Sequence, residues 1–252
     1  MKTLKEFGES GKLLVAAHRG SSGNAPENTI SAFRLAYEEG ANMIETDLQF
    51  TSDGYIVAVH DLHRFEQEKI RDIQTLEDFK MLDAGEWFDS RFKGEKIPQL
   101  EEILDFAKDK LYLNLELKVN NKSIEAGQIE YMLKIIYRSG LDKNLMFSSF
   151  NYSLLKLIKT IDSGIHTAVI NIPGKTALPS EICEETNSDA FICSLYEIND
   201  TINEDIVRNN LFLGVYSVDN IEQFDFISKY KVSAIGTNYP KVINDILKER
   251  KK

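Results

Sequence analysis

Eight short apolar segments alternate with amphipathic stretches along the chain, and this alternation limits the folds that the chain can adopt. Each apolar segment has the length of a buried strand, and the stretches between them repeat apolar residues at helical spacing. Such alternation is typical of a parallel sheet, and eight repeats favour an α/β fold closed as a (β/α)₈ TIM barrel. An open doubly wound sheet would show a similar pattern. The predicted strands are 13–17, 43–50, 111–118, 145–150, 166–171, 190–194, 211–218 and 232–237.

The stretches between the predicted strands fit helices, and their ends carry helix signals. Asn28 or Thr29 fits an N-cap, and Gly40 fits the position after a helix that ends at Glu39. No linker-like tract interrupts the chain, so we expect one domain over residues 1–252. The predicted helices include 29–39, 100–110, 124–138, 153–161, 203–209, 220–230 and 242–251.

Charge and composition argue against several classes of protein. A net charge of −10 argues against nucleic-acid binding, which relies on clusters of Lys and Arg. No apolar run is long enough to cross a bilayer, and residues 1–10 lack the apolar stretch of a signal peptide. We therefore expect a cytoplasmic protein without stable membrane insertion, and we leave its oligomeric state open. Cys183 and Cys193 fit reduced buried thiols in a helix and the following strand.

A turn signal at residues 51–54 predicts a hairpin after the second strand, because another strand pattern follows within a few residues. If the two middle residues of the turn form its centre, Glu45 faces His60 and Asp47 faces Ala58 across the hairpin. This register would bring the histidine to the carboxylates.

Residues 61–98 break the alternation, and we interpret them as a small cap inserted over the barrel mouth after this hairpin. They include a short helical pattern at 76–82 and the aromatic segment at 86–88.

Charged and polar side chains gather at the predicted ends of the first three barrel strands, where a (β/α) barrel collects its active-site groups. They are His18, Arg19, Glu45, Asp47, Asn114, Glu116 and Lys118. Alternation along a strand aims the last three toward one place. Each residue alone has a structural explanation, and Glu27 with Asn28 fits a simple helix cap, but their convergence favours a functional site.

Glu45, Asp47 and Glu116 would repel one another at a barrel mouth unless a cation compensates them. Oxygen ligands without Cys point to one divalent cation, Mg²⁺ or Ca²⁺. His18 and His60 suit base and acid roles at a phosphodiester, because imidazole titrates near neutral pH.

Arg19 offers a fork for two phosphate oxygens, and Lys118 adds a point charge. Together with the predicted metal ligands and histidines, these cations indicate a metal-and-phosphate site.

The chain resembles the glycerophosphodiester phosphodiesterase family, within the superfamily of phospholipase C-like phosphodiesterases. The resemblance rests on motifs in the family's order and spacing, from Ala17-His18-Arg19-Gly20 to Gly236-Thr237-Asn238-Tyr239-Pro240. Between them stand Ala25-Pro26-Glu27-Asn28-Thr29, Ile44-Glu45-Thr46-Asp47, Ser52-Asp53-Gly54, Val59-His60-Asp61, Leu82-Asp83-Ala84-Gly85, Leu115-Glu116-Leu117-Lys118, Phe147-Ser148-Ser149-Phe150 and Val215-Tyr216-Ser217-Val218-Asp219.

The resemblance implies the same barrel, the same metal ligands and the same pair of histidines. It also implies hydrolysis of a small-molecule glycerophosphodiester to sn-glycerol 3-phosphate and an alcohol. Whether water or the glycerol 2-hydroxyl attacks phosphorus first stays open.

Two departures from the family pattern concern the substrate. The stretch between Asp61 and Asp72 is shorter than usual and lacks a Thr-Asn-Gly run, and Tyr216 stands where the family usually has tryptophan. Tyr216 is therefore expected to line the substrate site with altered specificity. Two alternatives are a lysophospholipase D-type activity, with an acyl chain on the aromatic cap, and a barrel that binds a phosphate ligand without catalysis.

Overall fold

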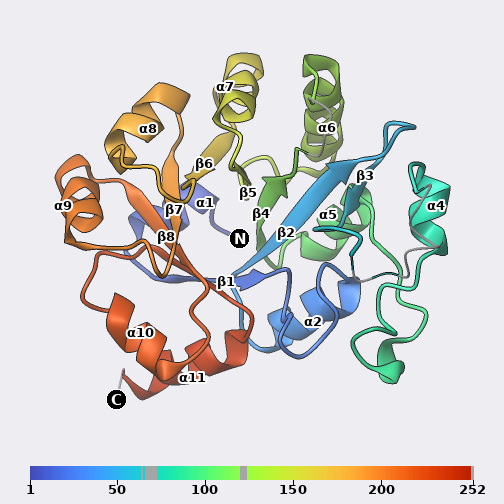
Figure 1. The fold of residues 1–252 in the computed structure, drawn as a ribbon, viewed down its shortest axis with the longest axis horizontal. Coiled ribbons are helices and arrows are strands. Elements are labelled where there is room, and N and C mark those ends of the chain that lie inside the picture. The colour runs from blue at the N-terminus through green and yellow to red at the C-terminus, as the bar shows by residue number, and fades with distance from the viewer. Residues whose placement is uncertain (64, 66–72, 120–123, 251–252) are drawn as a thin grey trace.

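The structure is a computed structural model that describes residues 1–63, 65, 73–119 and 124–250. Within these residues, eight parallel strands close into a barrel, because β1 pairs with both β2 and β9 (Figure 1). The predicted TIM barrel is confirmed, and the open sheet was the wrong alternative. The barrel strands are β1 (Leu14–His18), β2 (Met43–Phe50), β4 (Tyr112–Leu117), β5 (Leu145–Ser149), β6 (His166–Ile170), β7 (Ala190–Ser194), β8 (Phe212–Tyr216) and β9 (Ala234–Thr237).

Helices surround the barrel (Figure 1). They are α2 (Ile30–Glu38), α5 (Leu100–Ala107), α6 (Ala126–Ser139), α7 (Tyr152–Ile161), α8 (Pro179–Thr186), α9 (Asp200–Asn209), α10 (Ile221–Ile227) and α11 (Pro240–Glu249). A further helix, α1 (Leu4–Glu9), lies at the amino-terminal end of the strands, where Leu4 and Phe7 pack against Tyr112. No described helix has the length and apolar character needed to cross a membrane.

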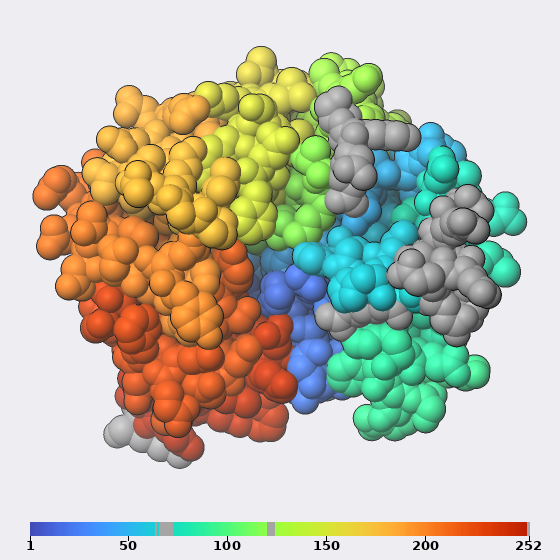
Figure 2. Space-filling model, viewed as in Figure 1, coloured from blue at the N-terminus to red at the C-terminus, as the bar shows by residue number. Residues whose placement is uncertain are grey.

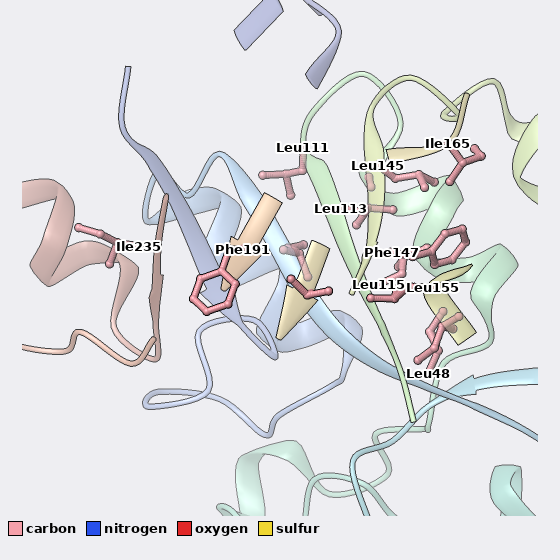
Figure 3. Packing of buried hydrophobic residues seen from close by; sticks show 14 of the residues in the cluster. Leu48, Leu111, Leu113, Leu115, Leu145, Phe147, Leu155, Ile165, Phe191 and Ile235 are labelled. Carbon is pink, nitrogen blue, oxygen red and sulfur yellow. The ribbon is translucent and has the colours of Figure 1, made fainter. Parts of the chain in front are cut away.

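The main core lies between the outward faces of the strands and the helices. Figure 3 shows Leu115 and Phe147 from neighbouring strands together with Leu155 of α7, and all three are fully buried. Because helices cover these outward faces, the strands are mostly apolar at their outward positions, and the charged residues of the site are left to the inward positions.

The hairpin has a different register from the predicted one. Strand β3 (Ile56–Ala58) runs antiparallel to β2, and Leu48 lies opposite Ala58. The predicted pairs, Glu45 with His60 and Asp47 with Ala58, are therefore wrong by one residue. The reason is Gly54, whose φ of 88° lets the loop hold three residues instead of two, and the Thr51 N–H closes it on the Tyr55 carbonyl at 2.9 Å.

An insertion follows this hairpin, as predicted, between β3 and α5. It contains α4 (Leu76–Met81) and the 3₁₀ helix η1 (Ser90–Phe92), and it flanks the hairpin side of the barrel (Figure 1). Phe79 and Ile97 belong to a small second core under the insertion. The part of the loop that is short relative to the family includes residues 64 and 66–72, which lie outside the described residues.

Candidate active site

The carboxyl ends of the barrel strands bring the predicted site residues together. Strand pairing places His18 beside Glu45 and Asp47 beside Glu116. The mouth of one cavity is lined by His18, Arg19, Glu45, His60, Glu116, Lys118 and Tyr216. Asp47 is fully buried in contact with Arg19 and Lys118.

Three buried carboxylates form the centre of the site. Glu45, Asp47 and Glu116 each offer an oxygen within 4.8 Å of the others. Burial, followed by repulsion from Asp47 and Glu116, raises the pKa of Glu45 well above its usual value. One Glu45 oxygen, Oε1, is buried without a hydrogen-bond partner in the described structure. A cation would compensate this arrangement, so the three residues fit a metal site.

Two cations flank the carboxylates. Lys118 pairs with Glu116, and its Nζ lies 3.0 Å from Asp47 Oδ1. Arg19 Nε lies 3.1 Å from Asp47 Oδ2, and the Arg19 backbone N–H donates to Glu45 at 3.0 Å. Burial alone would raise the pKa of Asp47, but Lys118 and Arg19 together hold it below its usual value. Asp47 therefore stays ionised.

His18 is held by a chain of hydrogen bonds that leaves one ring nitrogen facing the site. Asn238 Nδ2 donates to Asp219 at 2.7 Å, so the amide oxygen of Asn238 faces His18 Nδ1 at 2.8 Å. Nδ1 therefore carries a proton and donates it, and Nε2 points to Glu45 at 4.0 Å with its lone pair free. Burial, followed by the charge of Arg19, lowers the pKa of His18, which favours a neutral imidazole.

His60 reaches the site from the segment after β3, where regular pairing with β2 has ended. Gln49 fixes this segment, because its side-chain amide donates to the carbonyls of Val59 and His60 at 2.9 and 2.8 Å. His60 Nδ1 lies 2.6 Å from Asp61, so Nε2 is again the nitrogen left for chemistry. Burial is the largest influence on the pKa of His60 and lowers it.

Tyr216 forms an aromatic wall beside His18. The two rings are nearly parallel, at an angle of 25° and a centroid distance of 6.5 Å. Burial, followed by the charge of Glu197, raises the pKa of Tyr216 to about 12. The hydroxyl is therefore protonated at neutral pH and is available as a hydrogen-bond donor.

Two pairs of residues that were not predicted as site residues lie beside the site: Glu27 with Asn28, and Asn238 with Asp219. Thr29 alone caps α2, whereas Asn28 donates to Asp47 at 2.9 Å and Glu27 pairs with Arg19 at 3.1 Å. Asn238 and Asp219 orient His18. All four residues lie in the motifs that carry the family resemblance, and this was the signal that could have identified them. Their contacts join different segments of the chain, which the pattern within one segment does not predict.

The comparisons with known proteins agree along nearly the whole chain. Residues 18–242 match the model of the Glycerophosphoryl diester phosphodiesterase family. A Caldanaerobacter subterraneus subsp. tengcongensis protein named glycerophosphodiester phosphodiesterase is 32% identical over 243 residues, which cover 94% of this chain and 99% of that protein. A Bacillus subtilis protein of the same name is 27% identical, over 94% of this chain and 87% of its own.

Among solved structures, an Oleispira antarctica phosphodiesterase in complex with the product sn-glycerol-3-phosphate superposes with a TM-score of 0.85 at 26% identity. That superposition covers 96% of this chain and 99% of the other. The chain therefore belongs to the glycerophosphoryl diester phosphodiesterase family of enzymes.

Proposed function

We propose that this protein hydrolyses glycerophosphodiesters to sn-glycerol 3-phosphate and an alcohol, with one divalent cation, Mg²⁺ or Ca²⁺, as its cofactor. The observation that carries the proposal is the buried triad of Glu45, Asp47 and Glu116 between two histidines that each leave Nε2 free. Family membership and the product bound by the Oleispira relative support the substrate class.

The charges of the site fit a cation and a phosphodiester together. Glu45, Asp47 and Glu116 carry three negative charges when ionised, and Arg19 and Lys118 carry two positive ones. A divalent cation held by the three carboxylates would change the balance from one negative charge to one positive charge, which suits a singly charged phosphodiester. Bound there, it would supply Lewis-acid stabilisation of the phosphate oxygens.

The remaining steps belong to the chain's own side chains. His18, neutral and oriented by Asn238, takes the proton of the attacking hydroxyl at Nε2. His60 is more exposed, and Asp61 holds its Nδ1; it acts after taking up a second proton at Nε2, and it gives that proton to the leaving alcohol oxygen as the P–O bond breaks. Arg19 and Lys118 stabilise the negative charge that develops at phosphorus.

The hydrolytic function is tested with glycerophosphocholine and glycerophosphoethanolamine. We expect release of sn-glycerol 3-phosphate with Mg²⁺ or Ca²⁺ and its loss under a chelator. Turnover that persists under chelation would contradict the metal requirement. Tight binding without product at saturating metal would favour the non-catalytic alternative.

Two substrates with different leaving groups distinguish the base role of His18 from the acid role of His60. A p-nitrophenol leaving group needs no proton to depart, so His60→Ala should retain turnover of glycerol p-nitrophenyl phosphate and lose turnover of glycerophosphocholine. His18→Ala should lose both activities. Equal losses on the two substrates in His60→Ala would remove the acid role from His60.

A further inference from the structure

Tyr216 places a phenol hydroxyl group at the mouth of the candidate active site. Its side chain is half-buried in the lining of the cavity, and its ring lies beside that of His18. Among residues 1–63, 65, 73–119 and 124–250, none forms a hydrogen bond with the phenol oxygen. The hydroxyl is therefore available to a ligand, both as a donor and as an acceptor.

A glycine on the neighbouring strand makes room for this ring. Tyr216 ends β8, Gly236 lies beside it on β9, and His18 ends β1 on the other side of β9. Figure 2 shows a depression at the centre of one face of the molecule, between blue segments from the start of the chain and orange to red segments from its end. A Cβ atom added to Gly236 would stand 2.9 Å from the Cβ of Tyr216, which is closer than two such atoms approach in proteins. Glycine thus allows Tyr216 to lie across β9 beside His18.

The mouth has two sides that differ in polarity. On the side of β2 and β4 lie the three carboxylates, and Gln49 of β2 fixes His60 on this side. On the side of β5 to β9, the described lining near the mouth is apolar apart from Tyr216. It includes Phe150, Ile192 and Gly236.

The proposed reaction points to a place for the glycerol group. The phosphate lies at the carboxylates and their flanking cations, and the leaving alcohol lies at His60, from which it receives a proton. The glycerol stays on the phosphate and extends to the side away from His60, where Tyr216 lies. Glycerol brings two hydroxyl groups, and a hydroxyl beside an apolar wall is stabilised where it finds a hydrogen-bond partner.

We propose that Tyr216 is a specificity-determining residue for the glycerol part of the substrate, because its phenol donates a hydrogen bond to a glycerol hydroxyl. The proposal rests on the proposed function, which sets the phosphate between the carboxylates and His18. It concerns a position at which this chain departs from the usual family pattern. A tryptophan there offers one N–H donor, whereas the hydroxyl of tyrosine both donates and accepts.

Phosphate monoesters measure this contact without requiring turnover. Calorimetry in the presence of Mg²⁺ or Ca²⁺ compares sn-glycerol 3-phosphate with propyl phosphate, which has the same carbon chain and neither hydroxyl. The ratio of their dissociation constants is the glycerol preference. One neutral hydrogen bond is worth about 2- to 12-fold in affinity, so Tyr216→Phe should lower the glycerol preference by this factor. A decrease of less than about twofold would overturn the proposal.

Ligands with one hydroxyl identify the group that Tyr216 binds. We expect Tyr216→Phe to weaken the binding of either 2-hydroxypropyl phosphate or 3-hydroxypropyl phosphate and to leave that of propyl phosphate unchanged. The ligand that loses affinity carries the bonded hydroxyl. Equal weakening of all three ligands would place the phenol at the phosphate and overturn the proposal.

Matched variants separate the hydroxyl from the packing around it. Tyr196→Phe makes the same change on a side chain that is 91% exposed, and it should keep the wild-type glycerol preference. Gly236→Ala should displace Tyr216 and lower the preference, with no further effect in Tyr216→Phe, which has no hydroxyl to displace. Gly127→Ala is the control, since an added Cβ there meets nothing within 4 Å.

The outcome with Gly236→Ala bears only on how Tyr216 is positioned. An equal loss of preference in the wild-type and Tyr216→Phe backgrounds would overturn the positioning role of Gly236. If Gly236→Ala fails to fold, the comparison of Tyr216→Phe with Tyr196→Phe carries the test.

Turnover assays separate this proposal from the proposed function. A glycerol preference that Tyr216→Phe lowers, in a protein that does not turn over glycerophosphocholine, would refute the hydrolytic function and leave the glycerol contact standing. Turnover with a preference that Tyr216→Phe does not change would refute only the contact. If both hold, Tyr216→Phe should raise KM for glycerophosphocholine more than it lowers kcat, because the contact is present in the bound substrate as well as in the transition state.

Discussion

Replacing Asn238 tests whether the fold selects the reactive nitrogen of His18. In Asn238→Ala, His18 Nδ1 loses the acceptor that lies 2.8 Å away, so the ring can rotate and place its proton on either nitrogen. Leaving a buried partner unsatisfied costs about 1–3 kcal/mol. At 1.36 kcal/mol per tenfold change in rate, this corresponds to a loss of about 5- to 150-fold in kcat. KM should change little, because Asn238 contacts His18 and Asp219 and none of the three carboxylates.

A swap variant shows whether the polarity of the hydrogen bonds matters or only their presence. Asn238→Asp alone puts a second carboxylate next to Asp219. The double variant Asn238→Asp with Asp219→Asn exchanges the two side chains, so His18 again has one acceptor, and that acceptor residue again has one hydrogen-bond donor as its other partner. We expect the double variant to recover at least about tenfold over Asn238→Asp in glycerophosphocholine turnover. Asn144→Ala, at the opposite end of β5, is the control, and thermal unfolding checks each fold. A kcat within twofold of wild type in Asn238→Ala would refute the reasoning.

Three further predictions concern charge and packing. Lys118→Met should lower kcat by about 100-fold, because it removes a cation aimed at the developing charge, whereas Lys110→Met on the exposed surface should match wild type in the same assay. In the metal-free protein, the pKa of Glu45 in the folded state is raised well above its value of 4.5 in the unfolded chain. The stabilisation that follows from this shift is complete below pH 4.5 and is lost as the pH rises through the folded-state pKa. Glu45→Gln should therefore raise the melting temperature under chelator more at pH 7 than at pH 4, and an equal change at both values would contradict this. Phe147→Ala should cost about 3–5 kcal/mol of unfolding free energy in urea titration, since the side chain is fully buried in the core, and a loss below about 1 kcal/mol would contradict that packing.

Local patterns in the sequence predicted the strands and helices well, because the buried strands are mostly apolar on their helix-facing side. Strand β2 runs over Met43–Phe50 and β7 over Ala190–Ser194, as expected from the sequence. Helix α1 was not predicted, because its amphipathic pattern is too short to recognise from the sequence. It is identified by its packing against the amino-terminal end of the strands. The pattern also predicted which side chains share a face, so Asn114, Glu116 and Lys118 were expected to point to one place.

The sequence by itself determined the strands, the polar strand ends and the chemical character of the site, because these depend on residue type and on spacing within one segment. Only the tertiary structure decided the relations between segments. Gly54 shifts the hairpin by one residue, so His60 reaches the site through the Gln49 contacts instead of strand pairing. Asn238 is joined to His18 across 220 positions, and the three carboxylates come together from β2 and β4. Periodicity within one strand carries no information about such distant contacts, since they depend on how the barrel closes.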